Sequence, residues 1–231
     1  MKKLLFLASA AILVFTAPAF ADLIVGLPAD SNTGNSFPFG GAYNGEYQQV
    51  YTAGAFAGPI TITDLEFYNT AFDSSATSMN SGNWTIALST TSANWDTLSS
   101  TFASNIGANN TTVFSGNLSQ PWAFGDTLDV TLSTPFTYNP GDGNLLMDIT
   151  VSDAIAPGGF IYFDTNGYNN GGLDGNSIMG RVYDSGTVDS GYGLVTGFST
   201  ATTSVPEPTS IAILASALIG FGFILRHRKS A

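Results

Sequence analysis

Oxygen-bearing side chains gather in the Gly-rich run "FDTNGYNNGGLDGNS" (residues 163–177), where they could hold a metal ion. Asp164, Asn166 and Asp174 supply carboxylate and amide oxygens on a flexible backbone, which are the ligands that Ca²⁺ takes. Asn, Asp and Gly also form tight turns, and the spacing does not match the ligand positions of an EF-hand loop. The run therefore predicts either a calcium site or a series of turns, and we expect no other cofactor.

Two tryptophans could contact a carbohydrate. Trp95 and Trp122 lie in the loop-like stretches "SANWDT" and "SQPWAFG", where an exposed ring could stack under a sugar. Burial in the core is the alternative, because large aromatic side chains are mostly buried. Trp84 alternates in phase with Ile86 and Leu88, so we expect its side chain in the core.

Most catalytic chemistry is excluded by the residues that are missing. The single histidine, His227, lies in the C-terminal tail, and the chain has no cysteine, so the middle of the chain, residues 22–199, cannot form a Ser/His/Asp triad, a Cys/His dyad or a His-bearing zinc site. Its lysines also lie at the two ends, which excludes a Schiff-base nucleophile or a phosphate-binding P-loop in between. Paired carboxylates remain, but no pair stands out among the many acids. We expect no catalytic residues and no enzyme activity.

Acidic residues dominate the middle of the chain. Residues 22–199 contain sixteen acidic side chains and one basic side chain, Arg181, for a formal charge of −15. Nucleic acid is excluded as a partner, because phosphate binding needs a basic footprint. Without disulfides the fold must rely on its core, which a chain of about 180 residues can build as one domain.

Short runs rich in β-branched and aromatic residues, separated by turn residues, fill this middle part. About ten strands are expected, at residues 23–27, 47–53, 60–68, 84–89, 112–115, 128–132, 145–151, 160–164, 178–183 and 194–198. Such a series predicts an all-β fold, a single antiparallel β-sandwich or jelly-roll-like ectodomain. One helical turn is expected in residues 95–107, capped by Asp96 or Thr97.

Two of these runs carry finer information. In residues 60–68 the apolar alternation changes phase between Ile62 and Leu65, and a β-bulge near Thr63 and Asp64 would return both side chains to one face. Residues 160–163 are apolar on both sides, which is typical of a central strand.

The N-terminus reads as a secretory signal peptide, residues 1–21. Positive charge at residues 2–3 precedes an apolar run at 4–15, and Ala19 and Ala21 fit a small-residue cleavage site. Cleavage there leaves Asp22 as the mature N-terminus, and an uncleaved membrane anchor is the alternative.

The C-terminus has three parts after a polar linker at residues 200–204. They are the motif Val205, Pro206, Glu207 and Pro208, the uncharged run 209–225, and the basic tail 226–231 with Arg226, Arg228 and Lys229. At about 1.5 Å per residue the uncharged run reaches roughly 25 Å, the short limit for a transmembrane helix. The positive-inside rule keeps the basic tail cytoplasmic, which places residues 22–199 outside. The alternative is a buried C-terminal helix of a soluble protein.

This order of parts resembles the PEP-CTERM sorting signal of Gram-negative bacteria, over about the last 27 residues. The resemblance implies recognition of Pro206, Glu207 and Pro208 by exosortase, a membrane-embedded enzyme similar to cysteine proteases, with Arg226 beginning the cytoplasmic stop. It also implies a link to extracellular polysaccharide and biofilm. Stretches such as "ITDLEFY" and "NWTIALSTT" look like an ectodomain often joined to this signal, but they imply no activity.

The sequence therefore predicts an exported structural or interaction protein, associated with the envelope or matrix. We expect it to be anchored in the inner membrane and then, after processing, to reach the cell surface or extracellular matrix. Its expected partners are an exosortase-like enzyme, the inner membrane and extracellular polysaccharide. The alternative is a carbohydrate- or calcium-binding β-sandwich module.

Overall fold

Antiparallel strands make up nearly all of the regular structure, which a computed structural model describes for residues 21–26, 30–41, 43–70, 75–156, 158–169, 172–173 and 178–200. The only other regular elements in these ranges are three short 3₁₀ turns, η1 (Ala53–Ala55), η2 (Phe102–Ser104) and η3 (Pro140–Asp142). The predicted all-β class is confirmed.

Six strands form the larger sheet. Their order is β13 (Thr187–Ser190), β12 (Met179–Tyr183), β3 (Gly45–Tyr51), β8 (Asn144–Ile155), β5 (Ser81–Thr91) and β6 (Thr111–Gly116). Every neighbouring pair is antiparallel, and β8 lies between β3 and β5 near the middle of the sheet.

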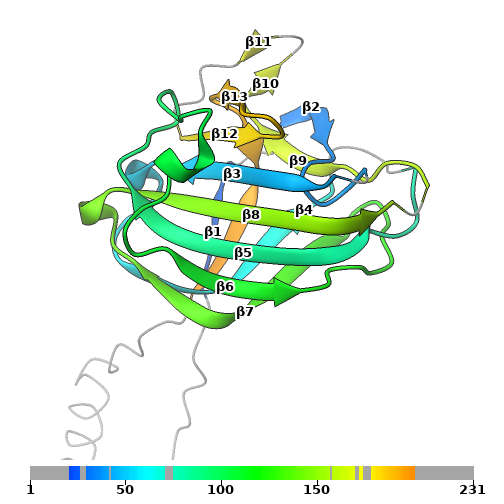
Figure 1. Ribbon diagram of the computed structural model, residues 1–231, viewed down its shortest axis with the longest axis horizontal. Helices are drawn as coiled ribbons and strands as arrows, with labels where there is room; N and C mark the ends of the chain where they lie inside the picture. The colour runs from blue at the N-terminus through cyan, green and yellow to red at the C-terminus, as the bar shows by residue number, and fades with distance from the viewer. Residues whose placement is uncertain are drawn as a thin grey trace, which may run out of the picture. The chain divides into compact units, whose positions relative to one another are not determined.

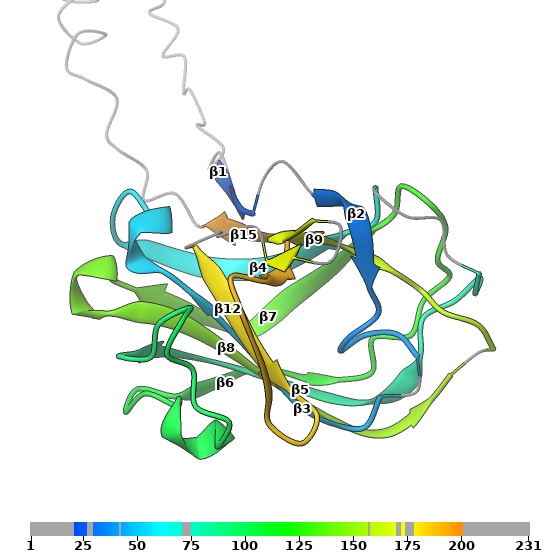
Figure 2. The ribbon, with the colours of Figure 1, turned by 90° about the horizontal axis from the view of Figure 1, so that it is seen from above.

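Four strands form the second sheet, in the order β1 (Ala21–Val25), β15 (Thr196–Thr200), β4 (Ile60–Tyr68) and β7 (Thr127–Tyr138). Figures 1 and 2 show this sheet stacked against the six-stranded one in a sandwich-like arrangement. At one edge β6 and β7 lie side by side, and the Ser133 hydroxyl donates to the carbonyl of Val113 at 2.9 Å.

A smaller three-stranded sheet contains β14 (Gly193–Leu194), β9 (Phe163–Asn166) and β2 (Asp30–Asn35). A short hairpin, β10 (Tyr168–Asn169) and β11 (Gly172–Leu173), follows β9 in the chain.

The core consists of alternate side chains from the facing sheets, because each strand turns every second residue inward. The largest fully buried members include Trp84, Tyr47, Tyr51, Tyr138, Phe39, Phe67, Phe163 and Phe198. Phe39 connects several of them: its ring centroid lies 4.7 Å from that of Phe67 and 5.4 Å from those of Trp84 and Phe163. Tilted and edge-to-face contacts at these distances favour aromatic packing.

Each of the ten predicted strands overlaps an observed strand, and β4 has the predicted bounds. Its register against β7 shifts between Ile62 and Asp64, and Ile62, Leu65 and Phe67 are all buried, so the predicted β-bulge is confirmed. Trp84 is also in the core as predicted, with an exposed fraction of 0%.

Three expectations need correction. Residues 160–164 do not form one strand: β9 begins only at Phe163, and Phe160 is 53% exposed. Residues 95–107 contain a turn and the 3₁₀ turn η2 in place of the turn capped by Asp96 or Thr97. Strands β2 and β13 were not predicted, because their runs "DSNTGN" and "TVDS" lack apolar alternation.

The described part of the chain contains no helix with the length and apolar character needed to cross a membrane. The predicted transmembrane run 209–225 lies outside that part, as do residues 1–20 of the signal peptide, residues 201–204 of the linker and the predicted basic tail.

Candidate functional site

The two ends of the ectodomain meet in one ladder. Ala21 pairs with Thr200 and Val25 with Thr196, so β1 and β15 are antiparallel neighbours, as Figure 2 shows. On its other side β15 pairs with β4, and the ring of its buried Phe198 lies 5.1 Å from that of Tyr51. Strand β15, which leads into the predicted linker, is therefore hydrogen-bonded along both edges, and Phe198 packs it against the core.

The predicted signal cleavage after Ala21 would leave Asp22 to Val25 of β1 in this ladder. Ala19 lies outside the described residues, as do the sorting residues and the membrane stop: Val205, Pro206, Glu207, Pro208, Arg226, Arg228 and Lys229. Their roles stay predictions.

Asp164, the first calcium candidate, is buried and holds a neighbouring segment in place. Its carboxylate accepts hydrogen bonds from the Thr70 backbone N–H at 2.8 Å and from the Thr70 hydroxyl at 2.5 Å. Asn166 donates through Nδ2 to the carbonyl of Gly26 at 2.9 Å. Asp174 lies outside the described residues, and within the described ranges no three acidic, histidine or cysteine side chains are grouped to hold a metal. Both described candidates thus have structural roles.

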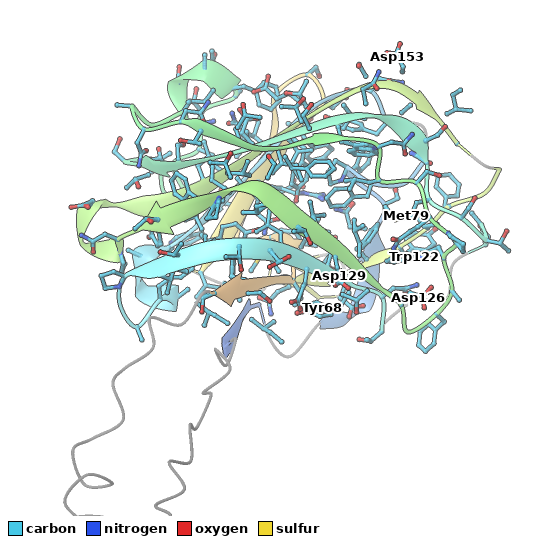
Figure 3. The ribbon with its side chains drawn as sticks, turned by 90° about the horizontal axis from the view of Figure 1, so that it is seen from below. Tyr68, Met79, Trp122, Asp126, Asp129 and Asp153 are labelled. Atoms are coloured by element: carbon cyan, nitrogen blue, oxygen red, sulfur yellow. The ribbon has the colours of Figure 1, made fainter. Side chains whose placement is uncertain are left out.

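Trp122 is 3% exposed, so its predicted availability to a sugar is wrong and the packing alternative holds. Its ring lies 4.9 Å from that of Phe163, and its backbone N–H donates to the Thr77 carbonyl at 3.0 Å. An isolated antiparallel β-bridge between Ser78 and Pro121 also holds the loop that contains Trp122. Figure 3 labels Trp122 beside Met79, another core residue.

Trp95 is half-buried on the outer face of the six-stranded sheet. It packs against a second apolar cluster, which consists of Val50, Leu98, Leu146 and Val182. Part of the Trp95 side chain is buried by this packing, so its main role is to cover the apolar cluster on that sheet.

An aromatic pair, the exposed Phe160 and the half-buried Tyr162, lies where the sequence predicted a strand. The two rings are stacked, with centroids 6.3 Å apart and planes 27° apart. The Phe160 carbonyl accepts from the N–H groups of Ser75 and Ala76 at 2.9 and 3.1 Å, and the Phe160 N–H donates to the Ser75 hydroxyl at 2.9 Å. A ring exposed on a fixed backbone can stack on a flat ligand at small entropic cost.

The single basic side chain of the ectodomain, Arg181, is buried. Its Nε and Nη2 donate to Asp189 Oδ2 at 2.9 and 2.8 Å. The guanidinium also lies over the rings of Tyr183 and Tyr192, at 4.4 and 4.2 Å from their centroids. The positive charge is therefore paired with Asp189 inside the fold.

Carboxylates face each other across the four-stranded sheet, where Glu66 pairs directly with Asp129. Glu66 accepts from the hydroxyls of Ser199 and Tyr68, each at 2.7 Å, and Tyr68 and Asp129 are labelled close together in Figure 3. Burial first, and then the charges of Glu66 and Asp64, raise the pKa of Asp129. This face is thus an acidic and hydroxyl-rich surface.

Comparisons with protein-family models, with curated proteins and with solved structures found no match for this chain. The molecule itself offers an acidic surface, the Phe160–Tyr162 pair and two ectodomain ends on neighbouring strands.

Proposed function

We propose that this chain is an exported structural or interaction protein without enzyme activity, sorted through its C-terminal PEP-CTERM-like signal. The pairing of β1 with β15 is the observation that best supports this proposal, because it places the predicted signal-peptide junction and the predicted linker at the ends of neighbouring strands.

The ladder also suits a tethered protein. A pull transmitted through the linker to Thr200 acts on β15, which is hydrogen-bonded to β1 on one side and to β4 on the other. Both ladders must break before the strand leaves the sheet, and Phe198 must leave the core with it.

Charge supports display away from the membrane surface. With a formal charge of −15 and its one arginine buried, the ectodomain is repelled by anionic lipid headgroups. In this proposal the anchor holds it at the inner membrane until an exosortase-like enzyme processes residues 205–208. The ectodomain then joins the cell surface or the extracellular polysaccharide matrix of a biofilm.

Mass spectrometry of cell fractions from an exosortase-bearing host tests the sorting step. We expect wild-type protein in the surface fraction to lack residues 209–231. Replacement of Pro206, Glu207 and Pro208 by alanine should leave the full chain in the inner membrane. Surface protein that still carries Leu225 and Arg226 would show that the C-terminal run is only an anchor.

A carbohydrate-binding module is the second candidate function, and the exposed ring of Phe160, which stacks on Tyr162, favours it. Sugars present apolar C–H faces that stack on aromatic rings, and the acidic surface favours a neutral polymer. Phe160→Ala should abolish retention of the protein on a neutral glycan array. Phe124→Ala is the matched control, because Phe124 is 57% exposed and has no stacked partner ring recorded in the described residues. Equal retention of the two variants would remove the Phe160 platform from consideration.

A further inference from the structure

Two carboxyl groups lie together on the outer face of the six-stranded sheet. Asp148 of β8 pairs with Gln48 of β3, and Glu46 stands two pairs further along β3, opposite Thr150 and on the same face. Such diagonal neighbours are within reach of each other on one face of a sheet. Asp148 is only 9% exposed, and its Oδ1 has no hydrogen-bond partner. A buried carboxylate oxygen without a donor is costly, and a proton removes the charge that causes the cost.

Asp148 accordingly has an unusual affinity for a proton. Burial, followed by repulsion from Glu46, raises the pKa of Asp148 to about 7. The Gln48 amide opposes this shift and lowers the pKa, whereas hydrogen bonding with Glu46 raises it further, because two carboxyl groups can share a hydrogen bond only when one of them carries a proton.

Residues 92–110 connect β5 to β6 in the chain. They lie over this face of the sheet, and we call them the cover segment. Leu98 of the cover segment packs with Val50, Leu146 and Val182 of the sheet. Trp95, Phe102 and Ile106 pack against the same cluster. The carboxyl pair therefore lies on the strands that this segment covers.

Gln48 links the carboxyl pair to the cover segment. Its Nε2 donates to Glu46 Oε1 and to the Phe102 carbonyl, both at 3.2 Å, and its Oε1 accepts from Asn105 Nδ2 at 3.0 Å. Asn105 in turn exchanges hydrogen bonds with the backbone of Ser99 at 2.8 and 2.9 Å. Both hydrogens of the Gln48 amide are therefore in use, one on the carboxyl pair and one on the cover segment.

We propose that Glu46 and Asp148 form a proton-operated latch, which holds the cover segment on the sheet while the pair carries a proton and loosens it when that proton is lost. An ionised Asp148 needs a donor, and Gln48 is the amide opposite it in the ladder. Turning a Gln48 hydrogen toward Asp148 breaks its bond to the Phe102 carbonyl, which is one of the polar attachments of the cover segment.

One further carboxylate lies near Glu46: Asp184, just after β12, donates its N–H to the Tyr43 hydroxyl, which itself donates to the Glu46 carbonyl. The outward residues of β5 beside the pair are Thr85, Ala87 and Ser89, which do not ionise in this pH range. Val182 and Val50 are the apolar residues on β12 and β3, and Asp96, which is exposed, is the only ionisable residue of the cover segment.

The direction of the pH effect follows from the raised pKa. Between the ordinary value of 3.8 and about 7, the folded protein keeps a proton that the unfolded chain has lost. Folding then binds a proton, so stability falls as the pH rises through this window and levels off above it. The latch is closed below about pH 7 and open above it.

Hydrogen exchange measured by mass spectrometry on the full-length chain in nonionic detergent tests the latch. After correction for the intrinsic exchange rate, we expect peptides from residues 92–110 to exchange on the order of tenfold faster at pH 8.5 than at pH 5.5, while peptides from β4 change much less. Asp148→Asn keeps the shape and supplies a neutral donor, so it should remove this pH response. Asp96→Asn, which removes an exposed charge from the cover segment itself, should retain it.

A second variant keeps the test decisive if Asp148→Asn does not fold. Glu46→Gln removes the repelling charge and should move the midpoint of the response to lower pH. The carboxyl carbon of Asp148, followed by NMR, should titrate near neutral pH. Titration near its ordinary value, or equal exchange of residues 92–110 at both pH values, would overturn the latch. So would a larger response to millimolar calcium at constant pH, which would make the pair a cation site.

Discussion

Single side chains explain why part of the ectodomain was predictable and part was not. Trp84 lies in a strand, so its parity with Ile86 and Leu88 identified it as a core residue, and it is fully buried. Trp122 lies in a loop, where no periodicity indicates which way a side chain points. Only the backbone bonds of residues 77–79 and 120–122 bring it into the core. The exposure of Phe160 was missed for a related reason, because its loop resembles a strand in composition.

Truncation of Trp84 should destabilise the fold strongly. Trp84→Ala opens a cavity beside Phe39 and should cost about 3 to 5 kcal/mol of unfolding free energy. Trp84→Phe should cost less than half of that, because the indole Nε1 has no hydrogen-bond partner to lose. Urea denaturation of both variants and wild type measures the difference. A neutral alanine variant would place Trp84 on the surface and contradict the fold.

Strands differ in how much of their position the sequence reveals. Those that bury one face, such as β4, β7 and β8, carry an alternating pattern that fixes both their existence and their inward residues. Strands β2 and β13 lack that pattern: β2 pairs with β9 through the backbone, and β13 is joined to β12 by backbone pairing and by the Arg181–Asp189 ion pair. The cover segment shows the same limit: its packing on β3, β8 and β12 depends on contacts far apart in the sequence. The Glu46–Asp148 pair could not be predicted either, because it required the register of β3 against β8.

Close packing of the cover segment on β12 depends on Gly180. A Cβ at this position would lie 2.3 Å from the Trp95 carbonyl oxygen, a backbone atom that cannot rotate away. Gly180→Ala should therefore displace the segment at a cost of about 1 to 3 kcal/mol and shift tryptophan fluorescence to the red. Gly54→Ala is the control, because a Cβ there meets nothing within 4 Å. Urea denaturation followed by fluorescence compares the two, and equal midpoints would mean that the segment can move at no cost.

For the molecule as a whole, the two features that bear most on its proposed function are its charge and the pairing of β1 with β15. Residues 22–199 carry sixteen acidic side chains and one buried arginine, so copies of this domain repel one another. Its fold contains no disulfide, so its integrity depends on the packed core and on complete ladders at the sheet edges. Strand β1 forms one edge of its sheet and lies next to the predicted cleavage site, so the position of the cleavage decides how many β1 residues remain paired with β15.

Removal of β1 should expose β15 and make the ectodomain associate. A chain beginning at Asp22 keeps four of the five β1 residues paired with β15, whereas a chain beginning at Gly26 loses them all. The freed edge of β15 then presents unpaired N–H and C=O groups to other copies, which is the usual route to edge-to-edge association. The loss of Leu23 and Val25 also uncovers part of the core. We expect the shorter chain to melt at a lower temperature and to form concentration-dependent oligomers, detected by circular dichroism and analytical ultracentrifugation, while the chain from Asp22 stays monomeric. If both chains melted together as monomers, β1 would be dispensable and the β1–β15 ladder could not be what secures the tethered end of the ectodomain.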